Sequence, residues 1–197
     1  MNIIQFTELL LEAAERGNDN HVKDLIPHSD SFYDDGRSLI VAAENGHVEC
    51  VRLLVSFSDP QNYFLALYKA ASNGHAQCVE ELINHCNPSE NHSSALQIAA
   101  GLGHTECVKL LIPVSDSTAD DSAALQAACE YGRYGAIDAL FEVSDVQAVL
   151  ESLHKKHSDR PACWQYLEEK ISQRQKQLLN NKLNNIVATK RLSYRKM

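Results

Sequence analysis

Three pairs of histidine and cysteine recur along the sequence at a spacing that places two side chains on the same side of a helix. They are His47 with Cys50, His75 with Cys78, and His104 with Cys107. Imidazole and thiolate groups are both zinc ligands, and a cysteine beside a histidine is also the arrangement that activates a nucleophilic thiolate. The pairs therefore raise two chemical hypotheses, a metal site and a catalytic cysteine.

The regularity of the pairs argues against both hypotheses. A structural zinc site needs four ligands at about 2.0–2.3 Å, whereas each pair supplies two and the next pair lies a whole repeat away. A catalytic cysteine needs one special pair in a cleft, with a third group to orient the histidine. We therefore favour a structural role, in which cysteine serves as a small buried hydrophobe, and we expect no cofactor, no bound metal and no enzymatic activity.

The pairs belong to a segment that is repeated along the chain. Its glycines stand at positions 17, 46, 74, 103 and 132, so the steps are 28 or 29 residues. Each glycine follows a small-residue pair such as Ala42-Ala43 and precedes an apolar segment such as Leu53-Leu54-Val55. Helical spacing on both sides of a glycine that suits a left-handed position predicts a helix–turn–helix–loop unit. Self-similarity at this period predicts an all-α solenoid.

These residues resemble the ankyrin repeats, whose consensus places Thr-Pro-Leu-His-x-Ala before Ala-x-x-Gly-His. The resemblance covers about residues 1–142, and the residues that match the end of the family's first helix are Gly46, His47, Gly74, His75, Gly103, His104 and Gly132. Segments such as Arg37-Ser38-Leu39-Ile40 replace Thr-Pro-Leu-His, and the period is shorter than the family's roughly 33 residues. The resemblance implies an ankyrin-type helical-repeat solenoid with shortened loops, trimmed β-hairpin fingers and a protein partner on its concave face.

The repeat pattern divides the chain into an array and a tail. We expect five ankyrin-like repeats at about 1–30, 31–59, 60–88, 89–117 and 118–142, a degenerate capping repeat at 143–171, and a basic C-terminal helix and tail at 172–197. Trp164 stands where Val108 stands in the fourth repeat, so we expect its ring to cover the last exposed apolar face. We predict one helix over Pro161–Ile171 and a separate final helix over Ser172–Arg191.

The final helix carries apolar residues that leave room for one packed stripe: Ile171, Leu178, Leu179, Leu183, Ile186 and Val187. We favour packing of this stripe on the apolar end of the array, with the basic residues facing water. Two alternatives are affinity for an anionic membrane or RNA, and head-to-tail self-association through attraction to the acidic array. We expect a monomer.

Charge is distributed unevenly along the chain. Residues 1–150 contain 22 Asp and Glu against 7 Lys and Arg, whereas residues 151–197 contain 4 against 11. Nucleic-acid binding needs clustered cations, so an acidic array argues against it. No apolar run is long enough for stable membrane insertion, and the N-terminus lacks a signal-peptide pattern. The six cysteines fit reduced thiols in a cytoplasmic protein.

The candidate binding residues lie in two places. The loop at 27–36 combines Phe32 and Tyr33 with Asp34 and Asp35, and its aromatics either contact a partner or cover the groove between units. The other candidates lie between the small-residue pair and the glycine, where the repeat varies most: Glu44, Asn45, Asn73, Leu102, Glu130 and Tyr131. We expect Tyr131 and Leu102 to be apolar anchors within a polar surround, although they could instead pack only against neighbouring units.

Two classes of function follow from these features. The first is a non-catalytic module that binds a protein partner through the concave face and loops. A short, free-standing array also resembles those of the eukaryote-like effectors that bacteria deliver into a host cytosol. The second is a regulatory or targeting part of an enzyme whose catalytic part lies elsewhere.

Overall fold

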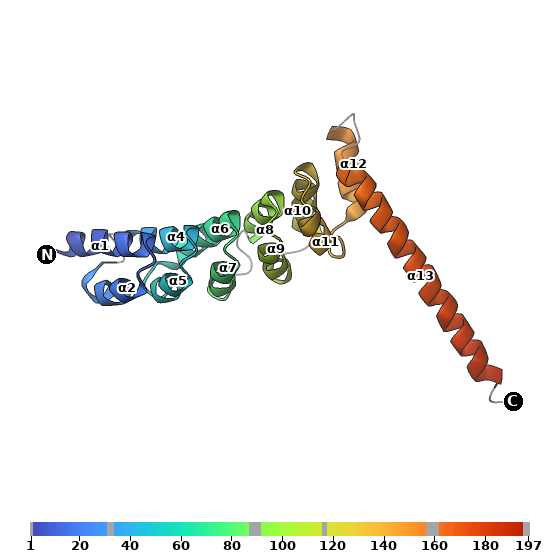
Figure 1. Cartoon of the computed structure of the whole chain (residues 1–197), viewed down its shortest axis with the longest axis horizontal. Coiled ribbons are helices and arrows are strands. Elements are labelled where there is room, and N and C mark those ends of the chain that lie inside the picture. The colour runs from blue at the N-terminus through green and yellow to red at the C-terminus, as the bar shows by residue number, and fades with distance from the viewer. Residues whose placement is uncertain (1, 31–33, 87–91, 116–117, 157–161, 195–197) are drawn as a thin grey trace. The chain divides into compact units, whose positions relative to one another are not determined.

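The chain is helical in the part that the computed structural model describes, which comprises residues 2–30, 34–86, 92–115, 118–156 and 162–194. Within these ranges there is no β-strand, so the predicted all-α solenoid is confirmed. The chain divides into two compact parts, Met1–Leu153 and His154–Met197. The first part, the array, holds the repeated units (Figure 1).

The array is built from helical pairs that stack in two rows (Figure 1). The first helices of the units are α1 (Ile3–Glu15), α4 (Arg37–Glu44), α6 (Tyr63–Asn73), α8 (His92–Leu102) and α10 (Thr118–Glu130). The second helices are α2 (Asp19–Leu25), α5 (Val48–Leu54), α7 (Ala76–Ile83), α9 (Thr105–Leu111) and α11 (Tyr134–Leu140). Each helix contacts the equivalent helix of the next unit, and α12 (Val146–Lys156) follows the fifth pair.

The units stack because each presents the same buried positions. One leucine in each first helix has no exposed surface, and neither do the alanine pairs of α4, α6 and α8; the leucines are Leu10, Leu39, Leu67, Leu96 and Leu125. Alanine leaves little bulk between neighbouring first helices, so their backbones can approach closely. In the second helices the buried positions are those of Cys50, Val51 and Leu54 in α5 and their equivalents in the other units.

The glycine of each unit ends the first helix in the same way. Gly46 has a φ of 79°, in the left-handed region, and the backbone N–H of His47 donates to the carbonyl of Ala42 at 2.9 Å. This pattern is the Schellman motif, in which the backbone N–H of the residue after the glycine donates to a carbonyl oxygen in the last turn of the helix that would otherwise lack a partner. Equivalent bonds close the other four first helices, which is why the two small residues precede the glycine at a constant distance.

A histidine joins each of three units to the unit before it. The Nε2 of His75 lies 3.0 Å from the carbonyl oxygen of Glu44, and the Nε2 of His104 lies 3.0 Å from that of Ser72. Because a carbonyl oxygen only accepts, Nε2 carries the proton and donates. His47 makes the same contact with Glu15, and Arg133 replaces histidine in the fifth unit by donating to Gly101 at 3.1 Å.

The histidine ring also needs the glycine of the preceding unit. A Cβ built on Gly46 would lie 2.5 Å from the Nδ1 of His75, and one on Gly74 would lie 2.5 Å from that of His104. The glycine therefore serves two purposes, because it adopts a positive φ and leaves space for the ring. Gly132 adopts a φ of 65° as well, but an added Cβ there would meet no atom within 4 Å.

The C-terminal part differs from the prediction in one respect. A single helix, α13 (Ala162–Tyr194), replaces the two helices expected on either side of residue 171. No glycine or proline interrupts this stretch, so its backbone continues past the expected boundary. Trp164 is 8% exposed, and its indole Nε1 donates to Glu168 one turn later, at 2.7 Å. Leu178, Leu179 and Leu183 are 55%, 62% and 52% exposed on this helix.

The two roles of the glycine can be separated by experiment. We expect Gly132→Ala to lower the free energy of unfolding by about 1–2 kcal/mol, the cost of a left-handed alanine. Gly74→Ala adds a clash with His104, so we expect it to cost about 1 kcal/mol more than Gly132→Ala. Urea unfolding of both variants measures the difference. In a His104→Ala background the two substitutions should cost the same, and equal costs with His104 present would contradict the steric role.

The buried cysteines generate a second prediction. Cys50, Cys78, Cys107 and Cys163 form no disulfide bond and are at most 2% exposed, and burial raises the pKa of Cys78 and Cys107 to about 11. We expect Cys78→Val to change the free energy of unfolding by less than about 1.5 kcal/mol, because the swap nearly conserves volume. Thiol labelling at neutral pH should reach these cysteines only on unfolding. Rapid labelling of the native protein would show that the positions are open.

Candidate functional site

The first helices share one exposed side along the array. Two positions four residues apart in each helix lie on this side: Glu12 and Arg16 for α1, Val41 and Asn45 for α4, Lys69 and Asn73 for α6, Ile98 and Leu102 for α8, and Ala127 and Tyr131 for α10. All ten side chains are exposed or partly exposed. Because residues four apart are neighbours on a helix, and because the units stack in register, these positions form a continuous surface. We call it the first-helix strip.

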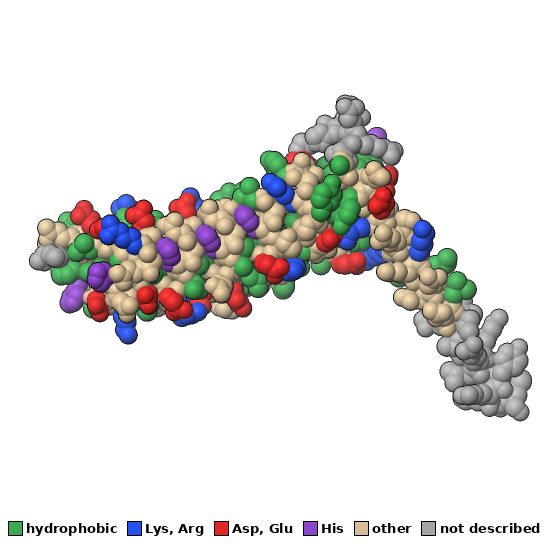
Figure 2. Space-filling model, in the orientation of Figure 1, with side chains coloured by type: hydrophobic (Ala, Val, Ile, Leu, Met, Phe, Trp, Pro, Cys, Tyr) green, Lys and Arg blue, Asp and Glu red, His purple; other side chains and the backbone are tan. Residues whose placement is uncertain are grey.

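The strip changes character along the array. Charged and polar side chains occupy both positions of the strip on α1 and on α6 and one of the two on α4. By contrast, α8 and α10 contribute only apolar side chains and Tyr131. Leu102 is 44% exposed and Tyr131 is 66% exposed, and Leu65, one turn before Lys69, is 43% exposed. In Figure 2 hydrophobic side chains gather over α10, while acidic and basic ones are frequent over α1 and α4.

Tyr131 rests on the neighbouring helix while most of its ring remains open to solvent. A Cβ built on Gly101 of α8 would lie 3.4 Å from the Cδ2 of Tyr131, so the ring lies close over the Gly101 backbone. The other units have Glu15, Glu44, Ser72 and Glu130 at the position of Gly101. Even the Cβ of such a side chain would be in van der Waals contact with the ring. The backbone at Gly101 thus provides a packing surface for one side of an exposed aromatic ring.

The polar candidates on this side are already engaged in local contacts. Glu44 accepts a bond from Lys69 at 2.8 Å, which joins α4 to α6, and Glu130 accepts one from Gln126 at 2.9 Å. The amide nitrogens of Asn45 and Asn73 donate to carbonyls one turn earlier, at 3.1 and 2.9 Å. These contacts fix the orientation of side chains whose remaining hydrogen-bonding capacity faces solvent.

In the loop before α4, Asp34 is buried and not exposed at the surface. Asp34 is 2% exposed, and its carboxylate accepts bonds from the backbone N–H and the hydroxyl of Ser38, the latter at 2.5 Å. Burial raises the pKa of Asp34, although the bonds to Ser38 oppose this effect. Asp34 therefore organises the start of α4. Asp35 is exposed with a φ of 46°, and Tyr33 lies outside the described residues.

Four of the nine candidate binding residues belong to the first-helix strip, namely Asn45, Asn73, Leu102 and Tyr131, but the sequence analysis did not identify their neighbours. Lys69, Ile98 and Ala127 lie one turn before Asn73, Leu102 and Tyr131, and they complete the first-helix strip. A helical spacing of four residues, applied backwards from the variable positions, would have found them. The contact of the Tyr131 ring with Gly101 had no comparable signal in the sequence, because it forms between two different units.

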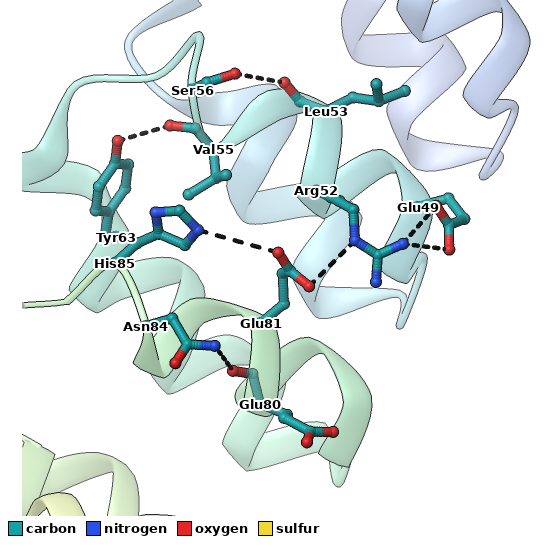
Figure 3. Close-up of polar contacts among 10 residues, drawn as sticks. All are labelled: Glu49, Arg52, Leu53, Val55, Ser56, Tyr63, Glu80, Glu81, Asn84 and His85. Carbon is teal, nitrogen blue, oxygen red and sulfur yellow. Dashed lines mark hydrogen bonds and ion pairs between the residues drawn. The ribbon is translucent and has the colours of Figure 1, made fainter.

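A second, polar surface lies between the second helices α5 and α7 (Figure 3). Arg52 donates to both carboxylate oxygens of Glu49, at 2.6 and 2.7 Å, and to Glu81 on the next unit at 3.2 Å. These bonds raise the pKa of Arg52. The adjoining groove has a volume of about 430 Å³ and is lined mainly by charged and amide side chains. The charges of Arg52, Glu49 and Glu81 are paired within the protein, so they offer a partner less than the first-helix strip does.

The histidine–cysteine pairs do not form reactive sites. In each pair the histidine Nε2 lies within hydrogen-bond distance of a backbone carbonyl oxygen, and the cysteine is buried in the stack with at most 1% exposure. Across the part of the chain that the structure describes, no cluster of three or more His, Cys, Asp or Glu is suited to hold a metal ion. Nor is any helix in these ranges both long and apolar enough to cross a membrane.

Comparison with known proteins agrees with this geometry. The family model described as "Ankyrin repeats (3 copies)" matches residues 10–92 and 67–149. Among solved structures, the chain is similar to the human ASB11 ankyrin repeat domain, with a TM-score of 0.57 and 26% sequence identity. The alignment covers 68% of this chain and 67% of that one. A search of curated proteins finds no match. Because the family model spans more than half of the chain, and the stacked helical pairs have the expected form, the chain belongs to the ankyrin-repeat family.

Proposed function

We propose that the array binds a protein partner through the first-helix strip, with Tyr131 and Leu102 as its apolar anchors. Ankyrin repeats are generally protein–protein interaction modules, and this chain belongs to that family. The observation that carries the proposal is the exposed Tyr131 ring held over Gly101 beside an exposed Leu102.

The physical argument rests on how interfaces gain their energy. Aromatic side chains that become buried at the centre of an interface contribute most of the binding free energy, and polar residues around them exclude water. Tyr131 already rests on a rigid helix, so little conformational freedom remains to be lost when a partner covers it. Glu130, Asn73 and the Lys69–Glu44 pair supply a polar surround on the same face.

Binding of a protein partner in this way requires no catalytic group on this chain. The paired histidines and cysteines are engaged in stacking the units, and the apolar end of the strip offers contact area without a nucleophile or a general base. Binding through a rigid surface is therefore the activity that these residues support best.

The test compares two exposed tyrosines of the array. Tyr131→Ala removes the proposed anchor, whereas Tyr134→Ala removes a ring that is 42% exposed at the start of α11, outside the strip. Partners captured from a cytosolic lysate with the wild-type chain are identified, and their affinities for the three proteins are measured. We expect Tyr131→Ala to weaken binding by about 2 kcal/mol or more, roughly 30-fold, and Tyr134→Ala to have little effect.

Thermal unfolding distinguishes an anchor from a packing residue. Because the Tyr131 side chain is mostly exposed, its truncation should leave the melting temperature nearly unchanged. If the melting temperature falls while the affinity is preserved, Tyr131 serves only the stacking of α8 and α10, and the strip is not the binding surface.

A further inference from the structure

Two asparagines at the ends of first helices are each followed by glycine, a step that favours loss of the asparagine amide. They are Asn45, before Gly46, and Asn73, before Gly74, and no other Asn-Gly step occurs in the sequence. Glycine has no Cβ to hinder its own backbone nitrogen, and its backbone is unusually free to move. Both asparagine side chains are exposed, so water reaches them. The ends of α4 and α6 therefore carry two steps that are prone to deamidation.

Deamidation at Asn45 or Asn73 needs no enzyme and no co-reactant other than water. The backbone nitrogen of the glycine attacks the Cγ of asparagine, and the new C–N bond closes a five-membered succinimide. The bond from Cγ to the side-chain nitrogen breaks, and this nitrogen leaves as ammonia with the proton of the glycine N–H. Water then opens the succinimide at either carbonyl carbon. Opening at Cγ gives aspartate, whereas opening at the backbone carbonyl gives isoaspartate, whose main chain is longer by one methylene group.

The closed end of α4 keeps the reacting atoms of Asn45 apart. Its ψ of −3° is helical, whereas the succinimide requires the Gly46 nitrogen and the Cβ of Asn45 to be nearly eclipsed about the bond from Cα to the carbonyl carbon. The Gly46 N–H donates to the carbonyl of Ala43 at 3.4 Å, and the side-chain amide of Asn45 donates to that of Val41 at 3.1 Å. Nucleophile and leaving group are both engaged, so the succinimide forms only when the helix end opens.

The histidine of the following unit holds the residues on both sides of Asn45. The Nε2 of His75 donates to the carbonyl of Glu44 at 3.0 Å, and its ring lies against Gly46, where an added Cβ would be 2.5 Å from Nδ1. Rotation of the peptide between Asn45 and Gly46 must displace this ring. Opening of the end of α4 is therefore coupled to loss of the His75 contact.

Asn73 is enclosed by an equivalent set of contacts. Its amide nitrogen donates to the carbonyl one turn earlier at 2.9 Å, and the Gly74 N–H donates to the carbonyl of Ala71 at 3.4 Å. His104 bonds to the carbonyl of Ser72 at 3.0 Å, and its ring lies against Gly74. Because the units of a solenoid contact mainly their neighbours, one junction can open while the other stays closed.

We propose that Asn45 and Asn73 are deamidation sites that the stack keeps unreactive, and that His75 and His104 control them separately. Opening of a junction then leaves a covalent change. Aspartate or isoaspartate adds a negative charge at the C-terminal end of a first helix, where the helix dipole disfavours it. Isoaspartate also displaces the glycine along the chain, so the bonds of the Schellman motif do not reform. This chemistry requires no partner and is independent of the proposed binding function.

Peptide mass spectrometry of the full chain, incubated at neutral pH, tests the proposal. Conversion of Asn45 and Asn73 to aspartate or isoaspartate is measured in the same digests, and the urea-unfolded chain supplies the rates without protection. We expect both sites to react at least about tenfold more slowly in the folded wild type than in the unfolded chain. Equal rates in the two states, or no conversion in the unfolded chain, would overturn the proposal.

Two histidine variants give the sharper comparison. His75→Ala should speed up the conversion of Asn45 by about fivefold, the effect of losing one hydrogen bond at that junction, and should change Asn73 much less. His104→Ala should have the reverse effect. A variant that keeps the circular dichroism of the wild type but speeds up both sites equally, or neither, refutes control by the individual histidines.

Arg133→Ala serves as the matched control, because it removes the equivalent contact at a junction where Leu102 stands in place of asparagine. It should leave the rates at both sites near those of the wild type. Asn62 and Asn84 serve as internal controls, since tyrosine and histidine follow them in place of glycine. They should keep their amides in the samples in which the two proposed sites react.

A second measurement on the wild type covers the case in which a histidine variant does not fold. In sub-denaturing urea the conversion rate of each asparagine should rise in proportion to the hydrogen-exchange rate of the glycine N–H that follows it, because both need the same opening. Conversion that stays constant while the N–H groups of Gly46 and Gly74 exchange faster would show that opening of the helix ends does not control deamidation.

Discussion

The array depends on a contact between the histidine of one unit and the end of the first helix of the unit before it. The imidazole Nε2 donates to a carbonyl near the end of that helix, and the ring occupies the space that the missing side chain of glycine leaves free. The helix end is closed by the Schellman motif, which itself requires the left-handed glycine. Glycine, histidine and the two small residues are thus parts of one interaction, repeated at three junctions, and Arg133 takes the place of the histidine at the fourth.

This interaction gives a structural role to the residues whose types and spacing suggested chemistry. A histidine that donates its Nε2 proton to a carbonyl oxygen, as His75 does, cannot also use that nitrogen as a base or a metal ligand. The cysteine one turn later faces the neighbouring unit, where burial disfavours the thiolate and raises the pKa of Cys78 to about 11. A reactive thiol needs the opposite environment, partly exposed and electropositive.

The sequence predicted best what local geometry decides, and least well what depends on contacts between distant residues. The period of the glycines was enough to place the helical pairs, because each first helix is closed by its own glycine. The burial of Asp34 could not be predicted from the sequence, because an acidic residue in a polar loop is expected to be exposed. Only the structure shows its hydrogen bonds to Ser38. The continuity of α13 was missed because a repeat boundary was extrapolated past residue 171, where no helix-breaking residue stands.

Positions that serve only to stack the units can keep the same residue in every unit. The positions that depart from the repeat are therefore the place to look for a function other than stacking. Three departures gather around α8 and α10: Gly101 replaces a larger polar residue, Tyr131 stands where the other units have arginine, asparagine or leucine, and Arg133 replaces the histidine. They are physically coupled, since the ring of Tyr131 lies over Gly101 and the guanidinium of Arg133 donates to the carbonyl of that same residue. Arg133 preserves the junction between the fourth and fifth units, and Gly101 gives up a polar side chain. Together they hold an aromatic ring at the surface of a stack whose other junctions expose none at this position. Stacking alone does not require that arrangement, and this supports the binding role proposed for the Leu102–Tyr131 end of the first-helix strip.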